Sequence, residues 1–399
     1  MGAVAPNPDP TLPRRKVGKS RIGVLRIPPY VPHNALVLPH LPTVCNTFNI
    51  KIQEEANILK KVRLGKTELM VTKTAFGALP IQRIPVEDAA KLVRRAFDAG
   101  INYFDTANAY TDSEQKLGIA FEGIRDQVVI STKSGGKDKA TVAAHIENSL
   151  RMLKTDYIDL FQFHNPAELP DINDPNGPFA AALEAKEKGY IRHIGITNHR
   201  PGKAKEAILS GHYETLQFPF CYLATEVDLE LVDLCKQHDM GFIAMKGLSG
   251  GLLNNAEACY AFMQQHENVV PIWGIQHEWE LDQWIELTNK GAEMTDEIKA
   301  IIDHDRKELA GNFCRSCGYC LPCPAGIEIP NAARMAQLIR RSPYKPYMSD
   351  AWHEKMHKIE NCLHCNACMS RCPYGLNTPD LLQMMLKDYD EFYAQHKDD

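Results

Sequence analysis

The sequence predicts an α/β fold, a (β/α)8 TIM barrel, followed by a small and mainly helical domain that binds metal. Short β-rich segments alternate with amphipathic helical segments from Leu64 to about Thr288. Eight such strands within about 225 residues fit a closed barrel better than an open doubly wound sheet. The second domain is indicated by cysteines, since eight of the twelve lie in two short windows near the C-terminus.

The chain divides into three expected parts. Residues 1–58 are rich in proline and lack sustained hydrophobic periodicity, which predicts a disordered extension. A second hypothesis is a start-site misassignment, because Gln53–Glu55 can be encoded by a purine-rich ribosome-binding site and Leu59 by a TTG start codon. The barrel is expected over residues 59–292, and the cysteine-containing domain over residues 293–399.

The composition is that of an ordinary globular protein, with 44% hydrophobic and 24% charged residues. A net charge of −5 argues against a general nucleic-acid or anionic-membrane partner. The sequence shows no apolar run of about 18 residues and no recognisable secretory signal, so we expect a cytoplasmic protein. In that setting, closely spaced cysteines favour metal ligation over disulfide bonds.

The barrel elements can be placed in order. Residues 62–73 contain a Gly-Lys-Thr turn and predict a hairpin that covers the floor of the barrel. The helix expected over residues 86–100 has an apolar face, and Gly100 stands where a C′ glycine belongs. The first strand is not followed by a G-x-G-x-x-G motif, which argues against a Rossmann domain. The eight strands are expected at residues 72–78, 101–107, 127–133, 157–164, 191–197, 213–220, 240–246 and 268–274.

The second domain is expected to begin with a helix over residues 295–311. Thr295 is a candidate N-cap, and Gly311 stands at the end of the helical pattern. A further helix is expected over residues 331–341, then a loop over residues 342–350. The last helix is expected over residues 378–395.

Four ionisable side chains are expected at one rim of the barrel, because functional groups of this fold lie at the C-terminal ends of the strands. Asp105 ends the second strand, and Tyr110 follows five residues later. Lys133 ends the third strand, and His164 ends the fourth. Each residue alone has an ordinary structural explanation, such as a helix cap or a solvated side chain. Their convergence from three consecutive strands favours a catalytic site.

The barrel segment resembles the aldo-keto reductase family over about residues 62–288. The resemblance rests on the segments GINYFDTANAY, STK, QFHNP, GITNH and LQFPF. It implies NAD(P)H-dependent reduction of an aldehyde or ketone to an alcohol, or the reverse, by hydride transfer. It also implies a catalytic tetrad made of Tyr110, Lys133, Asp105 and His164.

The chemistry of the four groups suits that reaction. Reduction of a carbonyl by hydride needs a proton donor at the developing alkoxide, and Tyr110 is the expected donor. A phenol has a pKa of about 10, and a nearby cation favours the ionised form, so we expect Lys133 to lower the pKa of Tyr110. Asp105 can pair with Lys133 and keep it charged. His164 can orient the carbonyl oxygen or assist proton transfer.

The resemblance also implies a cofactor site. Thr197 and Asn198 end the fifth strand and Gln217 ends the sixth, where relatives hold the nicotinamide carboxamide. The glycine-rich segment after the seventh strand, residues 247–253, could bind the pyrophosphate through backbone N–H groups. The expected contacts in that segment are Gly247, Leu248 and Gly250.

Two departures from the family pattern affect the choice of cofactor. Met245 stands where many relatives stack an aromatic residue on the nicotinamide. Gln276 and His277 stand where relatives often carry Arg or Lys for the 2′-phosphate of NADPH, and neutral groups are weaker phosphate ligands than a guanidinium. NADP(H) is the cofactor that the resemblance implies, and NAD(H) is the alternative.

The second cysteine window has the C-x2-C-x2-C-x3-C-P spacing of bacterial ferredoxins, which predicts a [4Fe–4S] cluster. A zinc site would need only two C-x2-C pairs. The cysteines of this window are Cys362, Cys365, Cys368 and Cys372.

The first cysteine window has one residue fewer before its last cysteine. In two-cluster ferredoxins the fourth cysteine of each run ligates the other cluster, so the shorter spacing remains compatible with two clusters. We therefore expect two [4Fe–4S] clusters, with one cluster and a zinc or empty site as the alternative. The expected ligand sets are Cys314, Cys317, Cys320 and Cys372 for one cluster, and Cys323, Cys362, Cys365 and Cys368 for the other.

Two classes of function are compatible with the sequence. The first is an NAD(P)H-dependent carbonyl or alcohol oxidoreductase with appended clusters. The second is an electron-transfer or redox-sensing iron–sulfur protein in which the barrel mainly binds nucleotide. Nicotinamide passes two electrons together and a cluster passes one, and the sequence has no flavin signature that would connect them. The expected partners are a small carbonyl or alcohol substrate and an external electron donor or acceptor protein.

Overall fold

The computed structural model describes residues 59–309, 313–341 and 344–397. All of these residues belong to one compact unit of the chain. The predicted extension over residues 1–58, with its start-site hypothesis, lies outside the described residues. The same holds for Gly311, the expected end of a helix, and for residues 342–343 of the expected loop.

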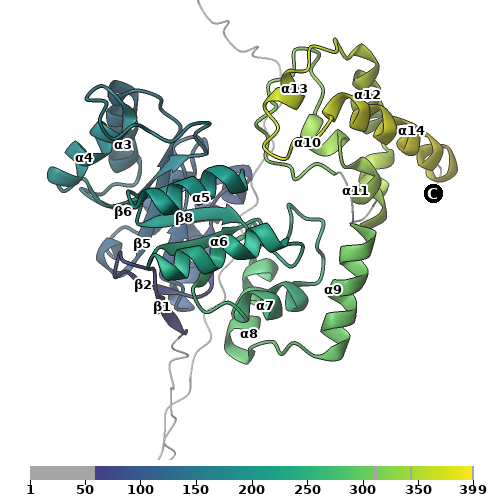
Figure 1. The fold of residues 1–399 in the computed structure, drawn as a ribbon. Coiled ribbons are helices and arrows are strands. Elements are labelled where there is room, and N and C mark those ends of the chain that lie inside the picture. Colours follow the sequence, from purple (N-terminus) through teal and green to yellow (C-terminus); the bar gives the residue numbers. More distant parts are fainter. Residues whose placement is uncertain (1–58, 310–312, 342–343, 398–399) are drawn as a thin grey trace, which may run out of the picture. The chain divides into compact units, whose positions relative to one another are not determined.

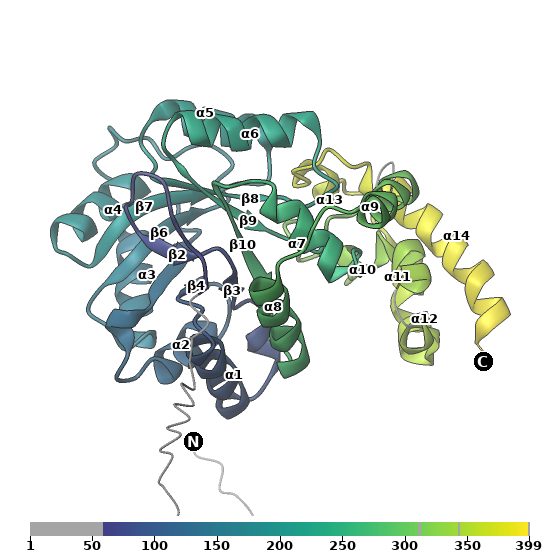
Figure 2. The same cartoon turned by 90° about the horizontal axis from the view of Figure 1, so that it is seen from below.

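Eight parallel strands close into a barrel, as Figures 1 and 2 show. Each strand pairs with its neighbour in the sequence, and the last strand pairs with the first to close the ring. The predicted (β/α)8 barrel is confirmed, and every strand overlaps its expected segment. The strands are β3 Ala75–Gly77, β4 Tyr103–Asp105, β5 Val129–Ser134, β6 Ile158–His164, β7 Ile191–Thr197, β8 Thr215–Pro219, β9 Gly241–Met245 and β10 Val269–Gly274.

The predicted hairpin lies at the floor of the barrel. It consists of β1 Lys61–Arg63 and β2 Met70–Thr72, which pair antiparallel. Leu64 and Val71 are fully buried in a cluster with inward-facing residues such as Tyr103 and Ile243. At Gly65 the backbone has φ +55°, and a Cβ there would lie 2.2 Å from the backbone nitrogen of Gly241. Only glycine therefore allows the turn to pack this closely against the start of β9.

Helices follow the strands and cover the outside of the barrel (Figure 2). In the first of them, the predicted apolar face is buried at Ala89, Leu92 and Val93, and Gly100 follows the helix with φ +98°. The helix therefore ends at the glycine that the sequence indicated. The helices are α1 Val86–Asp98, α2 Ser113–Ala120, α3 Lys139–Met152, α4 Pro178–Glu187, α5 Pro201–Ser210, α6 Glu226–Gln237, α7 Ala256–Gln264 and α8 Glu278–Lys290.

Among its described residues, the region after the barrel consists of helices joined by irregular segments, and the cysteine windows lie mostly in these segments. The first helix begins as predicted at Thr295, whose side chain accepts a hydrogen bond from the N–H of Ile298 at 3.3 Å. The helix expected over residues 331–341 is divided in two, because the N–H of Arg334 bonds the carbonyl of Asn331 in a tighter turn. The helices are α9 Asp296–Glu308, α10 Ile329–Ala332, α11 Met335–Arg341, α12 Asp350–His357, α13 Ala367–Ser370 and α14 Thr378–His396. Within the part of the chain that is described, none of the helices is long and apolar enough to cross a membrane.

Candidate active site and iron–sulfur sites

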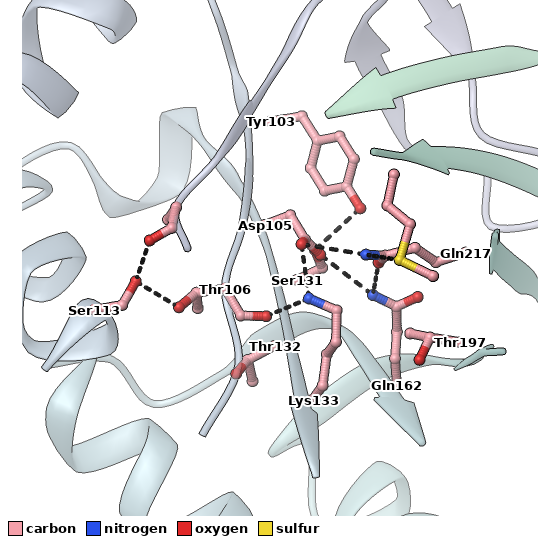
Figure 3. A network of polar contacts seen from close by, with 12 residues as sticks. Tyr103, Asp105, Thr106, Ser113, Ser131, Thr132, Lys133, Gln162, Thr197 and Gln217 are labelled. Carbon is pink, nitrogen blue, oxygen red and sulfur yellow. Dashed lines mark hydrogen bonds and ion pairs between the residues drawn. The ribbon is translucent and has the colours of Figure 1, made fainter. Parts of the chain in front are cut away.

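A buried ion pair lies at the centre of the predicted rim (Figure 3). Asp105 ends β4, Lys133 lies near the end of the neighbouring strand β5, and their Oδ2 and Nζ atoms are 2.6 Å apart. The ammonium also donates to the Thr106 carbonyl at 2.5 Å. Asp105 and Lys133 are 2% and 1% exposed. A pair this deeply buried keeps the lysine in one position at the rim.

Neutral donors satisfy the rest of the Asp105 carboxylate, as the dashed lines in Figure 3 show. Ser131 Oγ donates at 2.6 Å, and the Nε2 atoms of Gln162 and Gln217 lie at 3.4 Å. Tyr103 in turn donates to Ser131 Oγ at 3.0 Å. Of these residues, only Gln217 was expected at the site.

The alternation of side chains along a strand could have identified the three residues that were not expected at the site. Tyr103, Ser131 and Gln162 each stand two residues before a residue of the predicted tetrad. Side chains two residues apart point to the same face of a strand, so these groups must also point into the barrel. Gln162 Oε1 is buried and has no hydrogen-bond partner among the described residues.

The structure brings the four predicted tetrad residues together. Lys133 Nζ lies 5.3 Å from the centre of the Tyr110 ring, over its face. The rings of Tyr110 and His164 have centres 5.9 Å apart and meet edge to face at 81°. The loop that carries the tyrosine is fixed, since its own N–H bonds the Ala107 carbonyl at 3.0 Å.

Burial dominates the protonation of the two rings. It raises the pKa of Tyr110 above the ordinary value, and the charge of Asp105 adds to this. The expectation of a lowered Tyr110 pKa is therefore wrong, because burial and the charge of Asp105 outweigh the Lys133 ammonium over the ring. Burial, with the charge of Lys133, lowers the pKa of His164 to about 3. Near neutral pH both rings are uncharged, and both can donate a hydrogen bond.

Two of the predicted carboxamide ligands lie at the end of β7, where Thr197 is the last strand residue and Asn198 follows it. Thr197 and Asn198 are almost fully buried. Thr197 Oγ1 accepts the N–H of Asn165 at 3.0 Å. Asn198 Oδ1 accepts the N–H groups of His199 and Arg200, both at 2.9 Å, and its Nδ2 donates to a backbone carbonyl. An asparagine amide has a second N–H, which is the group that a ligand could use.

The predicted pyrophosphate loop contacts the cysteine-containing domain. The Gly250 carbonyl accepts a hydrogen bond from Arg334 at 2.7 Å, and Lys246 Nζ donates to the Ser316 carbonyl at 3.1 Å. A Cβ at Gly247 would come within 2.4 Å of the Trp273 ring, so this position has no room for a side chain. Leu248 packs partly buried against the core. The loop is thus shaped by both domains.

The region expected to bind a 2′-phosphate already holds a carboxylate. The N–H groups of Gln276 and His277 both donate to Glu280 Oε2, at 2.7 and 2.8 Å. Glu280 lies in the first turn of α8, where the helix dipole favours an anion. Its negative charge competes with a phosphate for the same N–H groups. Nearby at the end of β9, Met245 Sδ lies 3.8 Å from Gln217 Nε2.

A cavity of about 370 Å³ lies between the barrel rim and the cysteine-containing domain. The barrel contributes loops that follow β7, β8 and β9, and the other domain contributes residues from both cysteine windows. The tetrad does not line this cavity, although residues beside the predicted cofactor ligands do. The lining includes His199, Phe218, Lys246, Ser249, Arg315 and Tyr374.

The eight clustered cysteines line two further cavities. One contains the first three cysteines of the first window together with Cys372, and the other contains the first three of the second window together with Cys323. Cys320 and Cys368 border both. Thiol donors in C-x2-C-x2-C runs inside a largely apolar shell are the donor set that iron–sulfur clusters require. The remaining described cysteines, Cys221, Cys235 and Cys259, are buried apart from these cavities.

Tyr374, which lines the first of these cavities, contacts His199 on the barrel rim, the residue that directly follows Asn198. His199 is 3% exposed, and its Nδ1 lies 2.8 Å from the Tyr374 hydroxyl. Its ring centre is 5.0 Å from that of Tyr319, which stands between Cys317 and Cys320. Tyr319 is also close enough to contribute to the raised pKa of Tyr110. One signal in the sequence could have indicated this contact, namely the tyrosines Tyr319 and Tyr374 within or beside the cysteine windows.

Known proteins share these sequence features. Residues 73–310 match the aldo/keto reductase family, and residues 313–377 match the 4Fe-4S dicluster domain. The chain is 27% identical over 209 residues to the uncharacterized oxidoreductase YqkF of Bacillus subtilis, covering 49% of this chain and 67% of that protein. It is 31% identical over 219 residues to L-galactose dehydrogenase of Arabidopsis thaliana, covering 48% and 66%. The alignments span between 52% and 67% of the length of four such relatives.

Solved structures share the barrel. Aldo-keto reductase AKR11C1 from Bacillus halodurans, in its holo form, matches with a TM-score of 0.55 at 24% identity, covering 62% of this chain and 96% of that one. An aldo-keto reductase from Klebsiella pneumoniae in complex with NADPH matches with a TM-score of 0.52 at 22% identity, covering 62% and 95%. These identities support the fold alone. Because the family match covers more than half of the sequence, the chain belongs to the aldo/keto reductase family, and it carries a 4Fe-4S dicluster domain after the barrel.

Proposed function

We propose that the chain is an NAD(P)H-dependent oxidoreductase that reduces an aldehyde or ketone to an alcohol, or catalyses the reverse reaction. The buried Asp105–Lys133 pair next to Tyr110 is the observation that carries this proposal. A bound nicotinamide would supply or accept the hydride. Tyr110 would supply the proton in reduction and accept it in oxidation. His164, which is neutral, would donate a hydrogen bond that orients the carbonyl oxygen.

The raised pKa of Tyr110 is compatible with this role. A protonated phenol is the form that can donate, and the alkoxide formed in carbonyl reduction is a stronger base than a phenolate. The charge of Lys133 is fixed 5.3 Å from the ring and stabilises the phenolate as it forms. Asp105 keeps that lysine charged against the effect of burial, which lowers the pKa of Lys133.

Cofactor binding is assigned to the groups beside the tetrad. Thr197, Asn198 and Gln217 would hold the nicotinamide carboxamide, and the loop with Gly247, Leu248 and Gly250 would approach the pyrophosphate. The adjoining cavity of about 370 Å³ offers room for part of the nucleotide. The Klebsiella relative was solved with NADPH, which supports NADP(H). Glu280 beside Gln276 argues for NAD(H), because a carboxylate repels the 2′-phosphate.

The proposal is tested by anaerobic assays of aldehydes, ketones and sugars with NADPH and NADH, using protein with intact clusters. Tyr110→Phe should reduce kcat by about 10²-fold to 10⁴-fold, the usual contribution of a positioned acid. Cofactor affinity, measured by nicotinamide fluorescence, should change little. Full activity in Tyr110→Phe would refute the assignment of the proton donor.

For the cysteine-containing domain we propose two [4Fe–4S] clusters, held by the two sets of cysteines that line separate cavities. A second candidate function follows from their positions. Tyr374 in the lining of the first cavity contacts His199 on the barrel rim, and Cys365 of the second cavity is exposed beside Leu363, which is 66% exposed. This arrangement favours electron exchange between the barrel and an external donor or acceptor protein.

The second candidate makes a separate prediction. NADPH mixed anaerobically with the protein, without a carbonyl compound, should bleach the cluster absorbance within the time of one turnover. If the clusters remain oxidised while carbonyl reduction proceeds, the electron-transfer function is refuted and the first proposal stands.

A further inference from the structure

Three side chains outside the proposed active site and the cysteine cavities converge on one point. His353 and His357 stand one helical turn apart on α12, and Asp390 lies on α14, which packs against α12 (Figure 1). Nδ1 of His353, Nε2 of His357 and Oδ1 of Asp390 all lie within 4.8 Å of one another. Residues four apart on a helix share one face, so both imidazoles point toward α14.

None of the three converging atoms has a hydrogen-bond partner among the described residues, and each atom is shielded from solvent, although the His357 and Asp390 side chains are 31% and 43% exposed overall. His357 Nε2 and Asp390 Oδ1 are 3.2 Å apart, within ion-pair distance, but their geometry is not that of a hydrogen bond. A buried polar atom without a partner costs about 1–3 kcal/mol. Three such atoms facing one point indicate a shared partner that lies between them.

The surroundings fix the rings in orientations that suit a ligand. The other ring nitrogen of His357, Nδ1, lies 2.9 Å from the Glu360 carboxylate. A carboxylate on the far nitrogen is the usual support for a metal-binding histidine, because it sets the tautomer and the ring orientation. The ring of His353 stacks on Tyr393 with centres 4.3 Å apart and planes inclined by 9°. Both rings are therefore held with one nitrogen facing the shared point.

We propose that His353, His357 and Asp390 bind one divalent transition-metal ion, in addition to the iron held by cysteines. Two imidazoles and one carboxylate form a common zinc donor set, with a remaining position for water. The same donors also suit Fe(II), but they lack the thiolates of a cluster site. The ion would join α12 to α14 five residues before Cys362 and so stabilise the second cysteine window.

Protonation of His357 or a buried water could also satisfy some of the three atoms, and each can be distinguished from a metal ion. Protonation of His357 would give it two N–H groups, one facing Glu360 and one facing Asp390, but it would leave His353 Nδ1 without a partner. A buried water could bridge all three atoms without any metal. Both alternatives predict that the site does not retain zinc.

Anaerobic equilibrium dialysis against buffered free zinc tests the proposal, with zinc and iron both counted per chain in protein that carries its clusters. The wild type should bind one zinc more than His353→Gln/His357→Gln, with unchanged iron. Glu360→Gln should weaken zinc binding by about 10-fold to 100-fold, as expected for a supporting carboxylate. Should the double variant lose iron through misfolding, the nearly isosteric Asp390→Asn replaces it.

His304→Gln is the matched control. His304 also lies near two carboxylates, but Asp305 and Glu308 are both bound by Arg341, so this change should not alter zinc binding. The proposal is overturned if wild type and variants bind equal zinc, or if no zinc binds. It is also overturned if zinc is gained only as iron is lost, since the zinc would then occupy cysteine sites.

Discussion

Removing either half of the buried Asp105–Lys133 pair should destabilise the barrel, but by unequal amounts. Asp105→Asn removes the negative charge beside the Lys133 ammonium and leaves it only neutral acceptors such as the Thr106 carbonyl. An uncompensated buried charge of this kind costs about 3–5 kcal/mol. Lys133→Met leaves a carboxylate that still accepts one short hydrogen bond from Ser131 and two longer ones from glutamines. Because hydrogen bonds to a charged group are each worth about 1.5–3 kcal/mol, we expect this variant to lose only about 2 kcal/mol.

Urea unfolding followed by tryptophan fluorescence measures both losses. Trp273 and Trp284 stack 3.8 Å apart and are buried in the barrel, so their emission reports its unfolding. Cluster absorbance is recorded in the same samples, because the chain has two domains and a single transition has to be demonstrated. The double variant Asp105→Asn/Lys133→Met should be more stable than Asp105→Asn alone, since it removes the uncompensated charge. Equal losses in the single variants, or losses that simply add in the double variant, would refute the reasoning.

Acid should destabilise the wild type more than His164→Gln. The folded His164 has a pKa of about 3, below the value of about 6.5 in an unfolded chain, so between these values only the unfolded chain takes up the proton. Between about pH 7.5 and about pH 5, the free energy of unfolding, measured with urea, should therefore fall by about 2 kcal/mol more in the wild type than in His164→Gln; equal losses would contradict this. Gly247→Ala should lower the free energy of unfolding by about 1–3 kcal/mol, because the new Cβ would lie 2.4 Å from the Trp273 ring. It should also alter the near-UV circular dichroism of Trp273, and an unchanged signal would show that the loop adapts. Cys323→Ser and Cys372→Ser should each remove about half of the bound iron, because the two cysteines line different cavities. The double variant should lose nearly all of the iron. If the double variant keeps as much iron as either single variant, the two cysteines belong to the same cluster.

The barrel could be predicted because its strands carry strong local signals. β6 is a run of seven residues that is buried up to its last residue, and the last four residues of β7 are buried; each strand is followed by an asparagine at the rim. The rule that functional groups lie at strand ends then predicted that Asp105, Lys133 and His164 lie close together, without any knowledge of contacts. The rule could not predict the net effect of the neighbouring charges on the pKa of Tyr110. The effect of Lys133 on Tyr110 depends on how much of the lysine charge Asp105 neutralises and on how deeply the phenol is buried, and both are tertiary properties.

The contacts of the second domain were less accessible to sequence analysis. The cysteine spacing alone suggested that Cys323 and Cys372 each ligate the cluster held mainly by the other window, because ligand spacing can be read from the local sequence. The hydrogen bond between His199 and Tyr374 spans 175 residues, and no periodicity signals it. Helix α12 has only eight residues and followed a segment expected to be a loop, so the convergence of its histidines on α14 emerged only from packing.

The central claim is that Tyr110 transfers the proton while hydride passes between nicotinamide and a carbonyl carbon. Stopped-flow mixing of cluster-loaded protein with NADPH and an active carbonyl substrate, recording nicotinamide and cluster absorbance together, tests it most directly. The account predicts substrate-dependent nicotinamide oxidation that slows by about 10²-fold to 10⁴-fold in Tyr110→Phe, without cluster bleaching in that phase. Nicotinamide oxidation that is equally fast in Tyr110→Phe, or that proceeds without substrate as the clusters bleach, would contradict it.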